Sequence, residues 1–259
     1  SIISDIEHII RLRMTQLITC RQRGINIMRV LITGAAGSIG RIVARGLNKS
    51  HHIRGFDLVE MPEIKDSQIG NLTDYDAVYD AVIGTDAVVH LGGLPGGDDW
   101  DSLLESNFIG TYNVFEAMRD ANVKRIAYAS RAGIFSHYPK SLKRTAELIP
   151  RPVGHYTVSK VFGESLAYSY SHQHGLECVC IRIGNFKLER DLPEHPHHLS
   201  HGDCIRVFER AITQENLKFE TVFGVSASNW PMYDLEHGKK KIGYIPQDAS
   251  YIPEEHWEE

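Results

Sequence analysis

The sequence predicts a doubly wound α/β fold, in which helices cover both faces of a parallel sheet. Short runs rich in Val and Ile alternate with longer stretches whose apolar residues recur at helical spacing. The 259 residues, 42% of them hydrophobic, suit one domain of ordinary size. A glycine-rich turn joins the first apolar run to the first helical stretch, as is typical of this fold.

Five short apolar runs are the predicted strands. Each is apolar along most of its length, as expected for a strand that is buried on both faces of a parallel sheet. They are RVLITG (29–34), HIRGFD (52–57), AVVHLGG (87–93), RIAYAS (125–130) and CVCIRIG (178–184).

Four helical stretches lie between and around these strands, and several end at Gly or Asn, residues that commonly terminate helices. They span residues 38–50, 74–84, 101–122 and 156–175. The alternation then weakens, and the chain predicts a loop at 185–200, a helix at 201–213 and a late strand at 219–225. We expect residues 185–259 to cover the carboxyl edge of the sheet, where ligands bind in such folds, and to supply the substrate side.

Residues 1–27 differ from the rest of the chain, and Met28 is a natural start for the first strand. We expect residues 1–27 to be an extension that packs loosely or not at all. A transit peptide is the alternative, against which Asp5 and Glu7 count. Residues 28–259 are predicted to form a single domain that binds a dinucleotide and a small-molecule substrate.

The composition argues against several classes of partner. A formal charge of -5 disfavours non-specific binding to nucleic acid or to an anionic membrane. No apolar run is long enough to span a bilayer. The four cysteines form no CxxC pair, which predicts reduced thiols in a cytoplasmic protein. They are Cys20, Cys178, Cys180 and Cys204.

The turn TGAAGSIG (33–40) predicts a dinucleotide site of the Rossmann type. Gly34 permits the tight turn, Gly37 lets the backbone approach a pyrophosphate, and Gly40 lets the helix pack on the strand. Asp57 ends the next strand, where a carboxylate accepts hydrogen bonds from the ribose hydroxyls and repels a 2′-phosphate. We therefore expect NAD as the cofactor, with a mere strand-end role for Asp57 as the alternative.

Further segments are placed to contact the same cofactor. In GNLTD (70–74), Asn71 and Leu72 are positioned to edge and cover an adenine, although this segment also suits a helix N-cap. The glycines of HLGG (90–93) allow a close backbone approach, although an ordinary turn would use them too. The predicted cofactor residues in these turns are Ser38, Ile39, Asn71, Leu72, Leu91, Gly92 and Gly93.

The segment YTVSK places Tyr156 and Lys160 at i and i+4 on one helix face. A phenol is a poor base at neutral pH because its ordinary pKa is about 10. A nearby ammonium stabilises the phenolate and lowers that pKa, so that Tyr156 can remove a hydroxyl proton while a hydride leaves the same substrate. An amphipathic helix with a surface Tyr and Lys is the alternative explanation.

In combination, these segments resemble the extended short-chain dehydrogenases/reductases, the NAD-dependent epimerase/dehydratase family. The likeness covers most of residues 28–200 and includes NFIGTYNV (107–114). Within the family the chain is most similar to the uronate dehydrogenases, on FGE (162–164), LSHGDCIRVF (199–208) and the tail within 223–250. The resemblance implies cofactor roles for Asn107, Tyr156, Lys160 and Ile183, and a homodimer formed through the helix that carries Tyr156.

The departures from that pattern fall on the substrate side. Uronate dehydrogenases have an SSNH stretch whose second serine assists the reacting oxygen and whose Asn and His touch the sugar. Here the stretch is Ser130-Arg131-Ala132-Gly133. A family serine is replaced by Asn185, and no arginine stands within 191–199 to pair with a uronate carboxylate.

Arg131 therefore has several open roles. It could polarise the carbonyl or bind a carboxylate or phosphate, since a guanidinium is always charged and donates in a planar fork. Alternatively, Ser130 is re-aimed to serve as the catalytic hydroxyl, or Arg131 faces solvent and activity is lost. The candidate catalytic residues are Ser130, Arg131, Tyr156 and Lys160, and the candidate substrate residues are Arg131 and Asn185.

The leading hypothesis is an NAD-dependent oxidoreductase acting on a small sugar or sugar acid. A sugar-nucleotide epimerase or dehydratase that retains NAD, and a non-catalytic NAD-binding protein, are the alternatives. The histidines of HPHH (195–198) and His201 suggest a metal, but Pro196 breaks the helical spacing and no second cluster completes a site. We expect no metal there, and a histidine-bearing loop over the substrate instead.

Overall fold

A seven-stranded parallel sheet forms the centre of the molecule, in the strand order β3-β2-β1-β4-β5-β6-β7. The computed structural model describes residues 26–97, 99–189, 191 and 195–257. Every neighbouring pair of strands in this sheet is parallel. The strands are β1 (Arg29–Thr33), β2 (His52–Asp57), β3 (Asp66–Ile69), β4 (Ala87–His90), β5 (Arg125–Arg131), β6 (Glu177–Ile183) and β7 (Phe219–Gly224).

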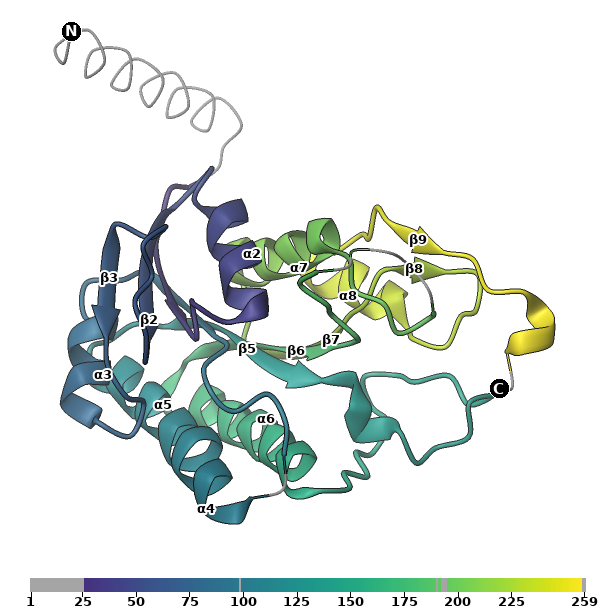
Figure 1. The fold of residues 1–259 in the computed structure, drawn as a ribbon, viewed down its shortest axis with the longest axis horizontal. Helices are drawn as coiled ribbons and strands as arrows, with labels where there is room; N and C mark the ends of the chain where they lie inside the picture. Colours follow the sequence, from purple (N-terminus) through teal and green to yellow (C-terminus); the bar gives the residue numbers. More distant parts are fainter. Residues whose placement is uncertain (1–25, 98, 190, 192–194, 258–259) are drawn as a thin grey trace, which may run out of the picture.

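Helices cover both faces of this sheet, as Figure 1 shows. One face packs on α2 and α7 and the other on α3, α5 and α6, so that each face has its own apolar core. The predicted doubly wound α/β fold is therefore confirmed. The helices are α2 (Ser38–Leu47), α3 (Tyr75–Val82), α4 (Trp100–Leu103), α5 (Gly110–Asp120), α6 (His155–His174), α7 (His201–Thr213) and α8 (Leu235–Ile242), with 3-10 turns at Ala132–Phe135 and Glu254–His256.

The order of the strands explains why the apolar runs are so continuous. All four residues of β4 are buried, because helices cover both of its faces. Alternate residues of β1 serve the two cores: Val30 and Ile32 pack toward α2 and α7, and Leu31 packs toward α3 and α5.

Several elements differ from the sequence expectation, among them the short strands at 227–228 and 249–250. The edge strand β3, with the sequence DSQI, was not predicted, because three of its four residues are exposed and it carries no apolar pattern. The helix α8 was not predicted either. The single helix expected over 101–122 is α4, a π-helical turn at Leu104–Ile109 and α5 in succession. A π turn shifts the helical register and frequently marks a functional site.

The C-terminal part is tied to the sheet by the buried carboxylate of Asp203 on α7. It accepts hydrogen bonds from the Ser226 hydroxyl at 2.7 Å and from the backbone amides of Gln247 and Asp248 at 2.8 and 3.2 Å. Residues 227–228 and 249–250 form the short parallel strands β8 and β9 beyond it. This part therefore packs at the end of the sheet, beside β6 and β7 (Figure 1).

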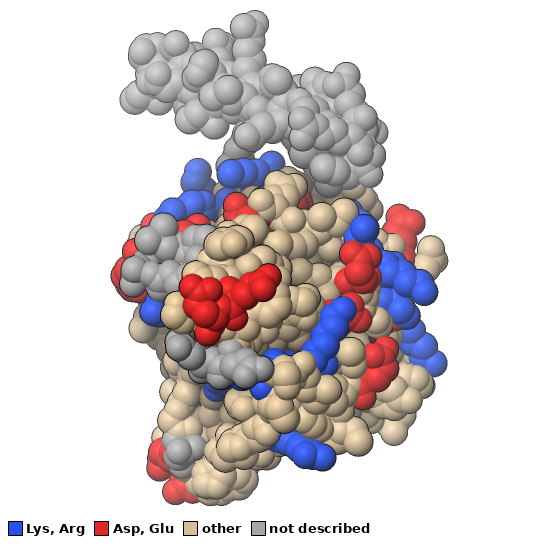
Figure 2. Space-filling model, turned by 90° about the vertical axis from the view of Figure 1, so that its right-hand side faces the viewer, with Lys and Arg blue, Asp and Glu red and all other residues tan. Residues whose placement is uncertain are grey.

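The surface carries mixed charge. On the face drawn in Figure 2, groups of Lys and Arg side chains alternate with groups of Asp and Glu. Within the described residues, no helix is long and apolar enough to cross a membrane. Cys178, Cys180 and Cys204 are buried free thiols, whereas Cys20 and the extension at 1–25 lie outside the described residues.

Candidate active site

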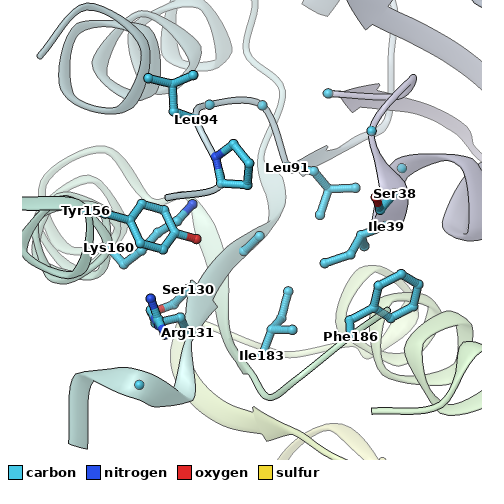
Figure 3. Close-up of a pocket in the computed structure, with 18 of the residues that line it drawn as sticks. Ser38, Ile39, Leu91, Leu94, Ser130, Arg131, Tyr156, Lys160, Ile183 and Phe186 are labelled. Atoms are coloured by element: carbon cyan, nitrogen blue, oxygen red, sulfur yellow. The ribbon is translucent and has the colours of Figure 1, made fainter. Parts of the chain in front are cut away.

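A cleft of about 1090 Å³ lies at the carboxyl edge of the sheet. All but one of the predicted site residues line it, and Asn107 is the exception. Those that line it are Gly34, Gly37, Ser38, Ile39, Gly40, Asp57, Asn71, Leu72, Leu91, Gly92, Gly93, Ser130, Arg131, Tyr156, Lys160, Ile183 and Asn185. Figure 3 shows the glycine-turn residues Ser38 and Ile39 on one side of the cleft and Tyr156, Lys160 and Arg131 on the other.

The glycine turn packs tightly against neighbouring backbone because it carries no side chains at two crowded points. Gly34 has φ +68°, and a Cβ there would lie 2.8 Å from the amide nitrogen of Gly92. A Cβ at Gly40 would lie 2.8 Å from the Cα of Ala35. The helix α2 begins at this turn with no side chain capping its N-terminus, so its first amides can bind an anion.

Asp57 is held at the end of β2 by two backbone amides. Its carboxylate accepts hydrogen bonds from the amide of Ala36 at 2.9 Å and from that of Leu58 at 2.7 Å. These bonds fix the carboxylate beside the glycine turn, where it can receive ribose hydroxyls. Nearby, Asn71 lines the cleft while Asp74 caps α3, so the cofactor and helix-cap interpretations of GNLTD are compatible.

Asn107 supports the cleft from behind. Its side-chain oxygen accepts a hydrogen bond from the Leu94 amide at 2.8 Å, and its amide group donates to the Ser159 hydroxyl at 3.1 Å. Asn107 thus ties the loop after β4 to α6, next to Lys160. Asn107 was expected near the cofactor, but it lies behind the residues that line the cleft.

The sequence reasoning missed a buried polar chain beneath the glycine turns. The hydroxyl of Thr33 and Nδ1 of His90 lie 2.7 Å apart, and Nε2 of His90 lies 3.1 Å from the hydroxyl of Thr111. Thr33 also accepts a 3.1 Å hydrogen bond from the Gly92 amide. Burial lowers the pKa of His90 to about 3, so this imidazole is neutral and holds the two turns together. A histidine inside the apolar run AVVH was the available signal.

Tyr156 and Lys160 lie one turn apart at the start of α6. The Lys160 ammonium is 5.6 Å from the centre of the Tyr156 ring, and Figure 3 shows both side chains pointing into the cleft. Lys160 is only 8% exposed, and its burial, with a smaller effect of Arg131, lowers its pKa to about 8. Burial raises the pKa of the Tyr156 phenol, whereas the Arg131 guanidinium lowers it.

Ser130 and Arg131, the two candidates for holding the substrate oxygen, make different contacts at the end of β5. The hydroxyl of Ser130 donates a 2.6 Å hydrogen bond to Glu164, which also forms an ion pair with Arg182. The guanidinium carbon of Arg131 instead lies 5.2 Å from the centre of the Tyr156 ring. Arg131 is half-buried and lies by the ring of Tyr156. Glu164 was visible in the sequence as part of FGE, but its buried role was not predicted.

Residues after β6 form one wall of the cleft. The side-chain amide of Asn185 donates a 2.8 Å hydrogen bond to Nε2 of His195. Nδ1 of His197 lies 2.6 Å from the hydroxyl of Tyr233, a residue that the sequence reasoning missed. Burial lowers the pKa of His197 to about 4, so it is neutral at physiological pH. Both histidines line the cleft, as expected of a histidine-bearing loop.

The charges that line the cleft are unequally distributed. Among the described lining residues, Asp57 is the one carboxylate, and it belongs to the cofactor end. The cationic side chains at the other end are Arg131, Lys140, Arg144 and Lys160. The part of the chain that the structure describes contains no group of three or more His, Cys, Asp or Glu that could hold a metal ion.

Comparison with known proteins agrees with this geometry. Residues 30–222 match the NAD dependent epimerase/dehydratase family. A uronate dehydrogenase from Pseudomonas syringae pv. tomato is 34% identical over 230 residues, which cover 86% of this chain and 83% of that protein. An L-arabinose 1-dehydrogenase (NAD(P)(+)) from Haloferax volcanii is 34% identical over 248 residues, which cover 86% of this chain and 97% of that protein.

A solved structure gives the same result. A mutant uronate dehydrogenase from Agrobacterium tumefaciens, complexed with NAD, superimposes with a TM-score of 0.81 at 31% identity, covering 86% of each chain. The expected resemblance to uronate dehydrogenases is thereby confirmed. This chain belongs to the NAD-dependent epimerase/dehydratase family.

Proposed function

We propose that this protein is an NAD-dependent dehydrogenase that oxidises a small sugar or sugar acid. The observation that carries the proposal is the pair of Tyr156 and Lys160 inside the cleft that begins at the glycine turn. Its relatives named as uronate and L-arabinose dehydrogenases support a small sugar as the substrate class.

Asp57 supports NAD over NADP as the cofactor. Its carboxylate is fixed by the amides of Ala36 and Leu58, and a negative charge at this position repels a 2′-phosphate. The following residues, Leu58 and Val59, are exposed and supply no cation for such a phosphate.

Tyr156 would act as the general base. Its phenolate oxygen takes the proton of the substrate hydroxyl, and the buried Lys160 ammonium stabilises the phenolate before the transfer. NAD, when bound, would supply the hydride acceptor for the substrate carbon that bears this hydroxyl. Asn107 positions this pair through Ser159, because its hydrogen bond holds α6 against the loop after β4.

The cations at the substrate end support a substrate that carries negative charge or many hydroxyl groups. Arg144 donates to the backbone carbonyls of Tyr138 and Pro139, so its guanidinium shapes the wall. Lys140 is exposed at the mouth, and Arg131 lies beside Tyr156. A hexuronate or a sugar phosphate matches this distribution.

Family membership also supports a second candidate, an epimerase or dehydratase that retains NAD through its cycle, because the match over residues 30–222 does not separate these reactions. The two candidates differ in one measurable respect. A dehydrogenase releases NADH in proportion to substrate, whereas an enzyme with retained cofactor carries bound NAD through purification and produces no net NADH.

The test is NADH formation from NAD with a panel of hexoses, hexuronates and sugar phosphates, and Tyr156→Phe is the control. We expect turnover of at least one member, and a loss of about 10²–10⁴-fold in kcat for Tyr156→Phe, with NAD affinity retained by calorimetry. Equal turnover by Tyr156→Phe would overturn the proposal. Saturable NAD binding with no turnover would favour the retained-cofactor or non-catalytic alternatives.

A further inference from the structure

We propose that Arg131 is the catalytic residue that holds the reacting oxygen of the substrate, and that Gly133 is the residue that gives its guanidinium room to do so. This inference rests on the proposed dehydrogenase function and names the residue that replaces the serine of similar enzymes. Positions 131 and 133 both depart from the family pattern, and the two changes are coupled.

The position of the Arg131 side chain is the first support. Its guanidinium carbon lies 5.2 Å from the centre of the Tyr156 ring, and both residues line the cleft. Figure 3 shows Arg131 at the end of β5, below the Tyr156 ring and beside Ser130. The guanidinium therefore lies next to the ring whose hydroxyl a substrate oxygen would meet.

Gly133 is the second support, because the Arg131 side chain lies directly over it. A Cβ at position 133 would overlap Nε of Arg131 and lie 2.8 Å from both Cζ and the nitrogen Nη2. Any side chain at position 133 would therefore displace the guanidinium. In the uronate dehydrogenases, the histidine of the SSNH stretch falls at position 133. A histidine side chain at this position would take the space of the Arg131 guanidinium, so the two exclude one another.

Ser130 does not compete for the same role. Ser130 is only 3% exposed, and its hydroxyl donates a hydrogen bond to Glu164 at 2.6 Å. Glu164 in turn receives two hydrogen bonds from Arg182, at 3.0 and 2.9 Å. Moving the hydroxyl toward the cleft would remove a donor from a buried carboxylate, which is unfavourable.

The chemistry of a guanidinium suits the task. In the oxidation, the O–H bond and a C–H bond of the substrate break and a C=O bond forms. The proton goes to Tyr156 and the electron pair of the C–H bond goes to NAD as hydride. Negative charge develops on the substrate oxygen during this step, and a fixed cationic donor stabilises it. Burial raises the pKa of Tyr156, and the Arg131 guanidinium opposes part of that rise, so it also favours the phenolate.

Three variants and one control test the inference. Arg131→Ala removes the guanidinium, and Arg131→Lys keeps the charge without the planar fork. Gly133→Ala leaves Arg131 in the chain and displaces its side chain. Gly96→Ala is the matched control, because nothing lies within 4 Å of a Cβ at Gly96. Steady-state kinetics are measured with a sugar of the panel that the original chain oxidises. The pKa of Tyr156 is measured from phenolate absorbance, as the difference between each protein and the same protein carrying Tyr156→Phe.

We expect Arg131→Ala and Gly133→Ala each to lower kcat by about 10²–10³-fold, and Gly96→Ala to keep it. Added guanidinium ion at millimolar concentration should partly restore Arg131→Ala. The pKa of Tyr156, already raised by burial, should rise further in Arg131→Ala, and Arg131→Lys should keep it near that of the original chain while losing kcat. A Gly133→Ala protein with the kinetics of the original chain would overturn the coupling, and an Arg131→Ala protein with unchanged kcat would overturn the catalytic role.

The phenolate titration needs no substrate, which separates this inference from the proposed function. If the original chain turns over no sugar, the dehydrogenase proposal fails, and the titration still decides on Arg131. A pKa of Tyr156 that rises in both Arg131→Ala and Gly133→Ala supports the placement of the guanidinium. A pKa that is the same in all the proteins contradicts it.

Discussion

The hydroxyl of Ser130 donates a 2.6 Å hydrogen bond to the carboxylate of Glu164, and this bond holds the Ser130 hydroxyl toward the core beneath the cleft. Glu164 is paired with Arg182 at 2.9 Å, and the two side chains are 7% and 4% exposed. The guanidinium of Arg182 also lies over the ring of Phe135, at 4.9 Å. The floor of the cleft is therefore a buried ion pair that a serine completes.

The first prediction concerns that ion pair. Glu164→Gln leaves the Arg182 guanidinium buried without a countercharge, and removal of one partner from a buried pair typically costs about 3–5 kcal/mol. We expect a loss of this order in the free energy of unfolding, measured by urea denaturation. Ser130→Ala removes one hydrogen bond and should cost about 1 kcal/mol. An equal loss for the two variants would contradict the central role of the ion pair.

The second prediction concerns the choice of cofactor. Asp57→Asn keeps the size of the side chain and removes the charge that repels a 2′-phosphate. We expect the preference for NAD over NADP to fall by tenfold or more, which corresponds to about 1.4 kcal/mol. Calorimetric titration of both cofactors measures the ratio of their dissociation constants. An unchanged ratio would mean that Asp57 only holds the turn through Ala36 and Leu58.

The third prediction concerns the C-terminal part. Asp203 is fully buried and accepts hydrogen bonds from Ser226 and from the amides of Gln247 and Asp248. Asp203→Ala leaves these donors unsatisfied, each at about 1–3 kcal/mol. We expect a lower urea midpoint and faster proteolysis between residues 227 and 250. Glu236→Ala, on the exposed face of α8, is the control and should behave as the original chain.

Much of this architecture could be predicted because the signals are local in the sequence. The buried strands are apolar throughout, and the turns at Gly34 and Gly92 carry glycines that steric contact requires. The strand β3 could not be predicted, because an exposed edge strand needs no apolar residues.

The roles of individual polar residues were harder to predict. Ser130 and Arg131 are adjacent in the sequence, yet Ser130 hydrogen-bonds Glu164 whereas Arg131 lies by the Tyr156 ring, and the sequence alone does not decide which of the two meets Tyr156. Glu164 and Tyr233 reach their partners from 34 and 36 residues away along the chain. The spacing within one helix was enough to predict Tyr156 and Lys160, whereas contacts between different elements depend on how the chain folds.

The fourth prediction concerns the stability cost of burying Lys160. The pKa of Lys160 falls from 10.5 to about 8 on folding, chiefly because the ammonium is buried. Below the folded pKa both states are protonated, and the folded state bears the full penalty of a buried charge. Between about 8 and 10.5 the unfolded chain binds the proton and the folded chain does not, so stability rises with pH across this window.

Lys160→Met replaces the ammonium by an apolar chain of similar length and removes that penalty. At neutral pH we expect a gain on the order of a few kcal/mol in the free energy of unfolding, because each tenfold change in an acid dissociation constant corresponds to about 1.36 kcal/mol. The gain should shrink as the pH rises through the same window, and kcat should fall because Tyr156 loses its stabilising cation. Urea denaturation of both proteins at neutral and alkaline pH measures the difference. A Lys160→Met protein less stable than the original chain at neutral pH would show that the ammonium contributes bonding that outweighs its desolvation.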